Sequence, residues 1–205
     1  RTDVTDEAGV AATLDAAQVR SWIEDLASPP SKPLWDDSGA PVPQATLDAI
    51  LANRALDAIP ASQSSRFGMA VQRTALRAFP TALRVFNRQG ETDIDRFQES
   101  ALFPGDAVVI THASGDGQWL FVVSERYAAW VEAAAIAEGS RELVLGYGQR
   151  TPQRIITGAK PRTVFTREQP ALSELQLDMG VRVPLADVAP DQPVNGQHPY
   201  TSWIV

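Results

Sequence analysis

The clearest pattern in the chain is a pair of short apolar runs between residues 116 and 132. After the turn pair Asp116-Gly117, Trp119, Phe121 and Val123 alternate with residues of the opposite face, which predicts a short strand. The run "RYAAWV" (126–131) predicts a second strand. It carries Trp130, 11 residues after Trp119. The two tryptophans either fill the interior of a small barrel or line a surface that binds a ligand.

Similar short strands are predicted along much of the remaining chain. They fall at 69–80, 106–114, 142–148, 154–166, 175–185 and 200–205, with a polar loop at 87–97 and a short helical turn at 133–139. Several short strands separated by turn signals are typical of a small barrel or sandwich.

The first third of the chain has a helical pattern instead. Residues 13–27 place Val19, Ile23 and Leu26 on one helix face with Thr13 as the expected N-cap, and a second helix is expected at about 46–58. Two helices of this size bury little apolar surface alone. We therefore expect the pair to pack against the strands that follow.

Composition and charge exclude several classes of function. The 205 residues carry a net charge of −7, and residues 1–60 account for −6 of it, with ten acidic against four basic residues. No clustered positive field exists for nucleic acid or an anionic membrane, and no apolar run reaches the ~20 residues of a membrane span. With no cysteine and only two histidines, no metal site and no cofactor are expected.

Three stretches carry a resemblance to a known family. They are "VQRTALRAFPT" (71–81), "DRFQESALFPGDAVVITHASGDGQWLFVVSERYAAWV" (95–131) and "GAKPRTVF" (158–165) with "SELQLDMGVRVPL" (173–185). Together they resemble the paired bacterial SH3 (SH3b1/SH3b2) domains of NlpC/p60-type cell-wall cysteine peptidases. The resemblance implies a mainly β fold with an N-terminal α segment and tandem SH3-like small β-barrels. The expected domains are a helical stabilising segment at 1–65, a first barrel at 66–139 and a second, incomplete barrel at 140–205.

The family's catalysis rests on a Cys-His pair that this chain lacks, so no catalytic residue is assigned to it. The resemblance then implies the non-catalytic substrate-recognition and targeting region of a peptidoglycan stem-peptide hydrolase. The resemblance implies a papain-like catalytic domain beyond Val205. The strand-like run at the end of the sequence agrees with a chain that continues, and the alternative is a C-terminal strand paired at a sheet edge. The expected location is the cell envelope, periplasmic or secreted, including a lipoprotein with its N-terminus removed. The alternative is a stand-alone SH3-like binding or adaptor protein of the envelope.

In such enzymes the first barrel helps to recognise the free N-terminal end of the stem peptide. An ammonium group requires a carboxylate or an aromatic face, and a peptide carboxylate requires an arginine. Glu125, Arg126 and Tyr127 offer these groups on one short loop and are the leading substrate-binding candidates. Trp119 and Arg77 complete the candidate set, with barrel packing as the alternative for Trp119. Arg73, Arg77 and Arg84 are a candidate anion-binding set, and a solvated face is the favoured alternative.

Other residues suggest catalysis, packing or nucleotide binding. His112, Ser114 and Asp116 are the residue types of a hydrolytic triad, but their spacing on one strand and turn supplies no positioned nucleophile or oxyanion hole, and an independent hydrolase built on His112 or His198 is disfavoured. Trp22, Trp35 and Trp203 are expected to serve in core or interdomain packing. The run 158–165 has no phosphate-cradling glycine pattern, so nucleotide binding is not expected.

Overall fold

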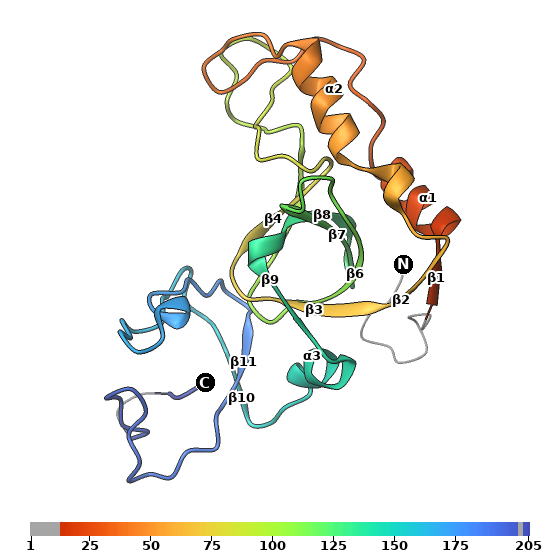
Figure 1. Ribbon diagram of the computed structural model, residues 1–205. Helices are drawn as coiled ribbons and strands as arrows, with labels where there is room; N and C mark the ends of the chain where they lie inside the picture. Colours follow the sequence, from red (N-terminus) through yellow and green to blue (C-terminus); the bar gives the residue numbers. More distant parts are fainter. Residues whose placement is uncertain (1–12, 201–202) are drawn as a thin grey trace.

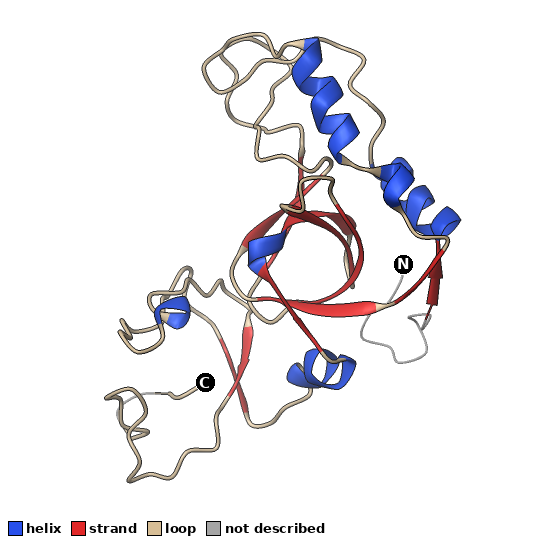
Figure 2. Cartoon of the chain, in the orientation of Figure 1, coloured by secondary structure: helices blue, strands red, loops and turns tan. Residues whose placement is uncertain are grey.

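The computed structural model describes residues 13–200 and 203–205 and arranges them in three parts. A central sheet curls into a small barrel, the N-terminal helices lie along one side and above it, and the C-terminal segment extends away below it (Figure 1). Most of the strand residues belong to the central barrel, whereas the C-terminal segment is mostly loop (Figure 2). The prediction of a mainly β fold with an N-terminal α segment is confirmed.

The barrel is one antiparallel sheet with the strand order β5-β4-β8-β7-β6-β3-β9. Its strands are β3 (Arg66–Ala70), β4 (Thr74–Arg77), β5 (Gln98–Leu102), β6 (Ala107–Ala113), β7 (Trp119–Ser124), β8 (Ala128–Glu132) and β9 (Ile136–Gly139). The pairing register shifts between Ile110 and His112 and between Leu76 and Arg77. Such irregularities bend a strand and raise its twist, which helps a short sheet to curl.

Two expectations for this region need correction. The single strand expected at 69–80 is two strands, β3 and β4, because residues 71–73 form a turn between them. Only 133–135 of the expected helical turn is helical (η2, Ala133–Ala135), and the residues after it form β9. The alternation predicted at 119–124 and the strand at 106–114 are confirmed as β7 and β6.

The alternation on β7 sorts its side chains into two separate cores. Phe121 and its neighbours at every second position join Trp130 on the outer face, beneath the N-terminal helix. Val122 faces the other way, into the barrel interior with Leu76 and Val131. Both faces of the strand are therefore buried, which explains why its sequence is apolar at nearly every position.

The N-terminal helices cover the barrel, as their size predicted. The elements are β1 (Thr13–Asp15), α1 (Ala16–Leu26), α2 (Gln44–Asn53), η1 (Leu56–Ala58) and β2 (Ser62–Ser64). The N-cap of α1 is Asp15, whose carboxylate accepts from the amide of Gln18, and the expectation of Thr13 in that role was wrong because Thr13 pairs with β2. Val19 and Ile23 of α1 are fully buried against the outer barrel face.

A third core joins α2 to the long loop between β4 and β5. Leu47 and Ile50 of α2 pack with Phe79, Val85 and Phe97. The two phenylalanine rings meet edge to face with centroids 4.8 Å apart. This small lobe fixes the loop at 78–97, which contains little regular secondary structure of its own.

The C-terminal segment departs most from the sequence-based expectations. It contains α3 (Arg141–Tyr147), β10 (Gln153–Ile155), η3 (Pro170–Leu172) and β11 (Arg182–Pro184), with β10 and β11 paired antiparallel. The strand expected at 142–148 was wrong: Ser140 caps a helix there by accepting from the amide of Leu143.

The strands expected at 154–166 and 175–185 reduce to these three-residue pieces. The strand expected at 200–205 falls partly on residues 201–202, outside the described residues, and 203–205 have no regular structure. A second SH3-like barrel at 140–205 stays a prediction. No helix among the described residues has both the length and the apolar character to cross a membrane.

Candidate functional site

The candidate loop is the tight turn that connects β7 to β8. The Ser124 hydroxyl donates to the carbonyl of Tyr127 at 2.7 Å and accepts from the Tyr127 amide at 3.0 Å. The Ser124 amide donates to the same carbonyl at 2.9 Å. Three hydrogen bonds between residues 124 and 127 thus close the turn and fix the directions in which Glu125, Arg126 and Tyr127 leave it.

Tyr127 reaches back across the sheet to a carboxylate on β5. Its hydroxyl donates to Oε2 of Glu99 at 2.6 Å, although the two residues are 28 positions apart in the sequence. The tyrosine side chain remains 37% exposed. The hydrogen bond to Glu99, with a smaller contribution from burial, raises the pKa of the Tyr127 phenol above its usual value, so the hydroxyl keeps its proton at neutral pH.

Arg126 makes a second pair with an acidic side chain. Its guanidinium lies 2.7 Å from Oδ2 of Asp106 and 5.9 Å from the centroid of the Phe103 ring. Asp106 also accepts from the Phe103 amide at 2.9 Å, which holds the carboxylate at the start of β6. Glu99, Asp106, Glu125, Arg126 and Tyr127 are hereafter called the turn site.

The turn site borders a cavity and carries excess negative charge. Glu125 and Arg126 line a hollow of about 460 Å³, whose other walls include Met179 and Arg182 of the C-terminal segment. Three carboxylates oppose one guanidinium in the turn site, a local net charge of −2. Such a surface favours a cation over an anion.

The structure does not bring Trp119 and Arg77 to this site. Trp119 begins β7, and the six-residue strand separates it from Ser124 by about 16 Å along the strand direction. Only 6% of Trp119 is exposed, and Trp130 is fully buried. Their positions in the core beneath α1 favour packing over a ligand platform.

Arg77 is enclosed in the loop lobe. Its guanidinium lies 2.7 Å from Oδ2 of Asp95, with side chains 5% and 7% exposed, and it also donates to the carbonyl of Leu83. Arg84 forms an exposed pair with Asp37, and Arg73 a half-exposed one with Asp178. The three arginines therefore do not form one anion-binding set, and the burial of Arg77 favours a structural role for its side chain.

The three residues of triad type are close in sequence but do not form a relay. Ser114 donates its hydroxyl proton to Asp116 at 2.6 Å, and this bond lowers the pKa of the Asp116 carboxyl. His112 faces another way, with Nε2 2.9 Å from the carbonyl oxygen of Arg54. Within 13–200 and 203–205, no group of three or more metal-ligating side chains has the geometry of a metal site.

Of the tryptophans assigned to packing, Trp203 does not lie in a core. Trp22 packs against the core beneath α1, and Trp35 forms a bridge with Phe86. Trp203 is 66% exposed, and the Arg154 guanidinium lies 4.0 Å from its ring centroid. Core packing is therefore wrong for Trp203, whereas interdomain packing stays a prediction.

Sequence reasoning missed Glu99 and Asp106. Both lie within the stretch "ESALFPGD" (99–106), which precedes the predicted strand 106–114 and contains a recognisable Pro-Gly turn. Pairing of β5 with β4, and of β4 with β8, brings Glu99 to Tyr127. A sheet order of this kind is not encoded in any local pattern, so only the three-dimensional arrangement could identify the pair.

These features define a mainly β protein with a small SH3-like barrel whose β7–β8 turn carries an acidic site. Residues 84–132 match the family described as SH3 domain (SH3b1 type). This matched range contains Glu99, Asp106 and the whole β7–β8 turn. The recognition of a bacterial SH3b region is thus confirmed. A comparison with curated protein sequences gives no match.

A solved structure has the same arrangement of the chain. It is described as a novel NlpC/P60 endopeptidase from Photobacterium damselae subsp. piscicida, and the two superpose with a TM-score of 0.72 at 19% sequence identity. The alignment covers 95% of this chain and 46% of that one. The present chain therefore spans less than half the length of this similar structure, with which it shares the fold.

Proposed function

We propose that this chain is the substrate-recognition region of a peptidoglycan stem-peptide hydrolase of the bacterial envelope. The SH3b1-type match and the likeness to part of an NlpC/P60 endopeptidase support a cell-wall-associated role. Peptide-bond hydrolysis would belong to a papain-like cysteine peptidase domain in the same polypeptide, because this chain contains no cysteine. Its own residues would position the stem peptide and break no bond.

The observation that carries the proposal is the Tyr127–Glu99 pair in an acidic, partly exposed turn site. A primary ammonium group has three donors and seeks acceptors of negative charge. Oε1 of Glu99 and the phenolic oxygen of Tyr127 can both accept from one ammonium while the existing 2.6 Å hydrogen bond persists. The site therefore fits the free N-terminal ammonium of a stem peptide, and the arginine at position 126 can contact a peptide carboxylate or carbonyl.

The test is an NMR titration of this chain with an alanine-initiated muropeptide whose N-terminus is free or acetylated. We expect the free amine to shift the amide signals of 124–128 and 98–100 in a saturable manner, and the acetylated form to bind at least about 10-fold more weakly, because a charge-assisted hydrogen bond contributes ~1.5–3 kcal/mol. Glu99→Gln should cause a similar loss. Glu91→Gln is the matched control, because Glu91 is a carboxylate of the loop at 87–97.

Equal binding of the free and acetylated peptides would remove the ammonium-recognition role from the turn site. Hydrolysis of the peptide by this chain alone, abolished by His112→Ala, would overturn the statement that these residues break no bond. The intact mass of the native protein tests the second half of the proposal. A mass larger by the ~100–150 residues of another domain supports it, whereas a mass near 22.2 kDa contradicts it.

One observation favours a second candidate, a stand-alone adaptor of the envelope. Of the twelve large apolar side chains found exposed in the described residues, nine lie in 141–205. Where such side chains form a contiguous patch, they mark a surface that binds another protein. The adaptor function is favoured if muropeptide leaves the Tyr127 signals unmoved while a defined envelope protein binds to 141–205.

A further inference from the structure

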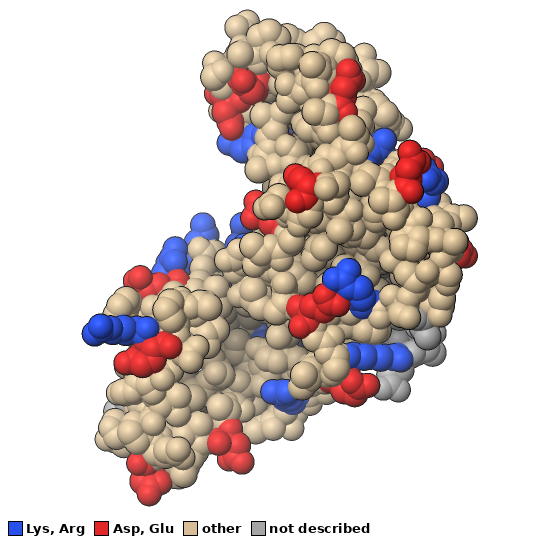
Figure 3. Space-filling view, viewed as in Figure 1, with Lys and Arg blue, Asp and Glu red and all other residues tan. Residues whose placement is uncertain are grey.

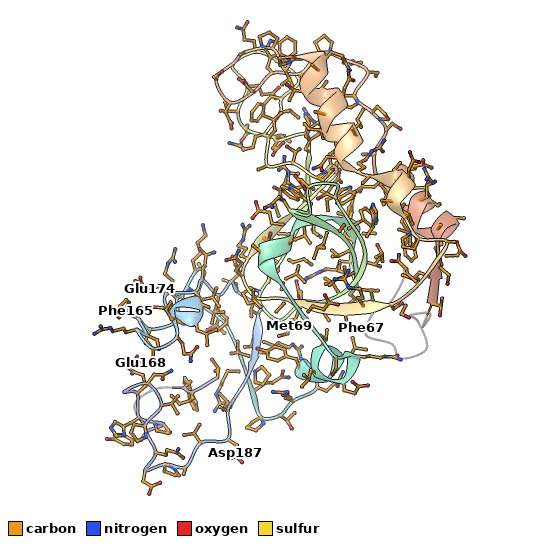
Figure 4. All side chains as sticks on the ribbon, viewed as in Figure 1. Phe67, Met69, Phe165, Glu168, Glu174 and Asp187 are labelled. Carbon is orange, nitrogen blue, oxygen red and sulfur yellow. The ribbon has the colours of Figure 1, made fainter. Side chains whose placement is uncertain are left out.

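A second cavity lies near the turn site and is not explained by it. The guanidinium of Arg73, which lines this cavity, and that of Arg126 in the turn site both lie 5.9 Å from the centroid of the Phe103 ring. The volume of the cavity is about 650 Å³, within the range of small-molecule sites. The β3–β4 turn supplies one wall through Arg73, and the C-terminal segment supplies Lys160, Arg162, Glu174 and Asp178. Glu174 lies beside the η3 segment, in the part of the chain that extends away from the barrel (Figure 4).

The charged groups of this cavity are only partly satisfied. Nε of Arg73 lies 3.6 Å from Oδ1 of Asp178, a long contact at a residue that is 52% exposed. Arg162 donates one N–H to the backbone carbonyl of Glu174 at 2.8 Å. Lys160 makes no hydrogen bond or ion pair with any residue that the structure describes. The guanidinium groups of Arg73 and Arg162 thus keep N–H donors for a ligand, and the Lys160 ammonium lies in the same hollow.

The sign of the local charge is opposite to that of the protein. Three cations face two carboxylates, a net charge of +1, in a chain whose total is −7. Asp178 is already engaged by Arg73 and by the side-chain amide of Gln176. Basic and acidic side chains are interspersed on the visible face of the C-terminal segment, so the positive charge is confined and does not spread into a broad patch (Figure 3).

We propose that this cavity, hereafter the basic hollow, binds an oxyanion, the carboxylate or phosphate group of a small ligand. The planar forks of Arg73 and Arg162 match the paired oxygens of either group, and Lys160 adds a point charge. The small net charge and the limited volume of this open hollow suit one anionic group of a ligand and not a polyanion such as nucleic acid. This site is separate from the turn site, which has the opposite charge.

The test uses two probes that carry an oxyanion and no ammonium group, inorganic phosphate and N-acetylalanine. Neither carries the ammonium group proposed to bind at Glu99 and Tyr127, and binding of either probe at Arg126 would shift the Arg126 amide, so the two proposals fail independently. At constant ionic strength, set with chloride, we expect saturable NMR shifts at 160–162 and 173–178 with Tyr127 unmoved. The probe that saturates at the lower concentration identifies phosphate or carboxylate as the preferred group.

Three variants sharpen the test. Lys160→Glu reverses one charge without removing any contact within the described residues, and it should weaken binding about 10-fold or more. Glu174→Gln removes an opposing charge and should strengthen binding. Arg167→Glu is the matched control, a charge reversal at an exposed arginine of the same segment that does not line the hollow, and it should leave the affinity unchanged.

The proposal is overturned if neither probe gives saturable shifts, or if chloride alone produces the same shifts. It is also overturned if Lys160→Glu and Arg167→Glu lower the affinity equally, because the effect would then come from overall charge. Opposite effects of Lys160→Glu and Glu174→Gln, with Arg167→Glu neutral, would establish the hollow as an oxyanion site.

Discussion

The barrel and the C-terminal segment are built from the same kinds of residue, yet they are stabilised very differently. Of the thirty hydrophobic residues buried among the described residues, only four lie in 141–205, although this segment is nearly a third of the chain. Its core consists of Leu177, Val181 and Val183 with three partly buried neighbours. The barrel instead has two cores on opposite faces of one sheet.

The difference indicates that the barrel is the rigid part of the protein and that the C-terminal segment is the part with the most exposed apolar surface. The entropy lost in ordering the backbone must be offset by apolar burial, and the barrel buries enough apolar surface to hold the three-residue β7–β8 turn and its side chains in one geometry. The C-terminal segment buries little, so it is expected to open more readily. Both candidate cavities combine a barrel wall with a wall from this segment.

The largest predicted effect separates the two regions directly. Trp130→Ala removes a fully buried indole that packs at 5.4 Å from the Phe121 ring, and it should lower the free energy of unfolding by about 3–5 kcal/mol. Phe165→Ala removes an equally apolar side chain that is 73% exposed and should change it by less than ~0.5 kcal/mol. Urea denaturation followed by tryptophan fluorescence and circular dichroism measures both. Similar losses from the two variants would contradict the comparison.

The second prediction compares an enclosed ion pair with a half-exposed one. Arg77→Ala removes the nearest cation from the buried carboxylate of Asp95, which keeps only a longer 4.0 Å contact with Arg84, and it should cost about 3 kcal/mol. Arg73→Ala breaks the pair with Asp178 at the edge of the C-terminal segment and should cost less than ~1 kcal/mol. Urea midpoints at low and high salt provide the readout, since only the exposed pair is screened. A small effect of Arg77→Ala on stability would contradict a structural role for Arg77 and favour a role in ligand contact.

The same contrast explains what the sequence could predict. The short apolar run around Phe121 indicated a strand, because burial on both faces of a sheet makes a strand apolar at nearly every position, and the structure confirms it. In the C-terminal segment, runs such as 154–166 contain β-branched residues, but few of them are buried. The β-branched pattern therefore predicted strands where no core exists to stabilise them. The turn residues of the site were identified from local chemistry. Glu99 and the basic hollow depend on pairings between distant segments, which no local pattern carries.

The third prediction concerns the independence of the C-terminal segment. Leu177→Ala empties the small cluster beneath β10 and β11 and should destabilise it by about 2 kcal/mol, near the low end for a buried leucine because few groups surround it. Hydrogen exchange should accelerate for the amides of Ile156 and Val181 and remain unchanged for Phe121 and Val122. Acceleration throughout the barrel would show that the two regions unfold as one unit.

The smallest predicted effect is a pH dependence restricted to the barrel and the helix above it. His112 of β6 donates from Nε2 to the carbonyl of Arg54, just after α2, and burial lowers the pKa of its imidazole. The unfolded chain therefore binds a proton more readily than the folded one. The contribution of this group is fully present above the unfolded pKa of about 6.5 and is lost as the pH falls through the lower folded value.

Urea denaturation at pH 7.5 and pH 5 should show a loss of stability that His112→Gln reduces, since an amide can donate to the same carbonyl without titrating. The carboxyl of Asp116 does not interfere, because its hydrogen bond with Ser114 lowers its pKa further below this window. Hydrogen exchange within 141–205 should not respond to the substitution. An unchanged pH dependence in His112→Gln would assign the loss of stability to another group. A change of hydrogen exchange within 141–205 would mean that the two regions are coupled more closely than their separate cores imply.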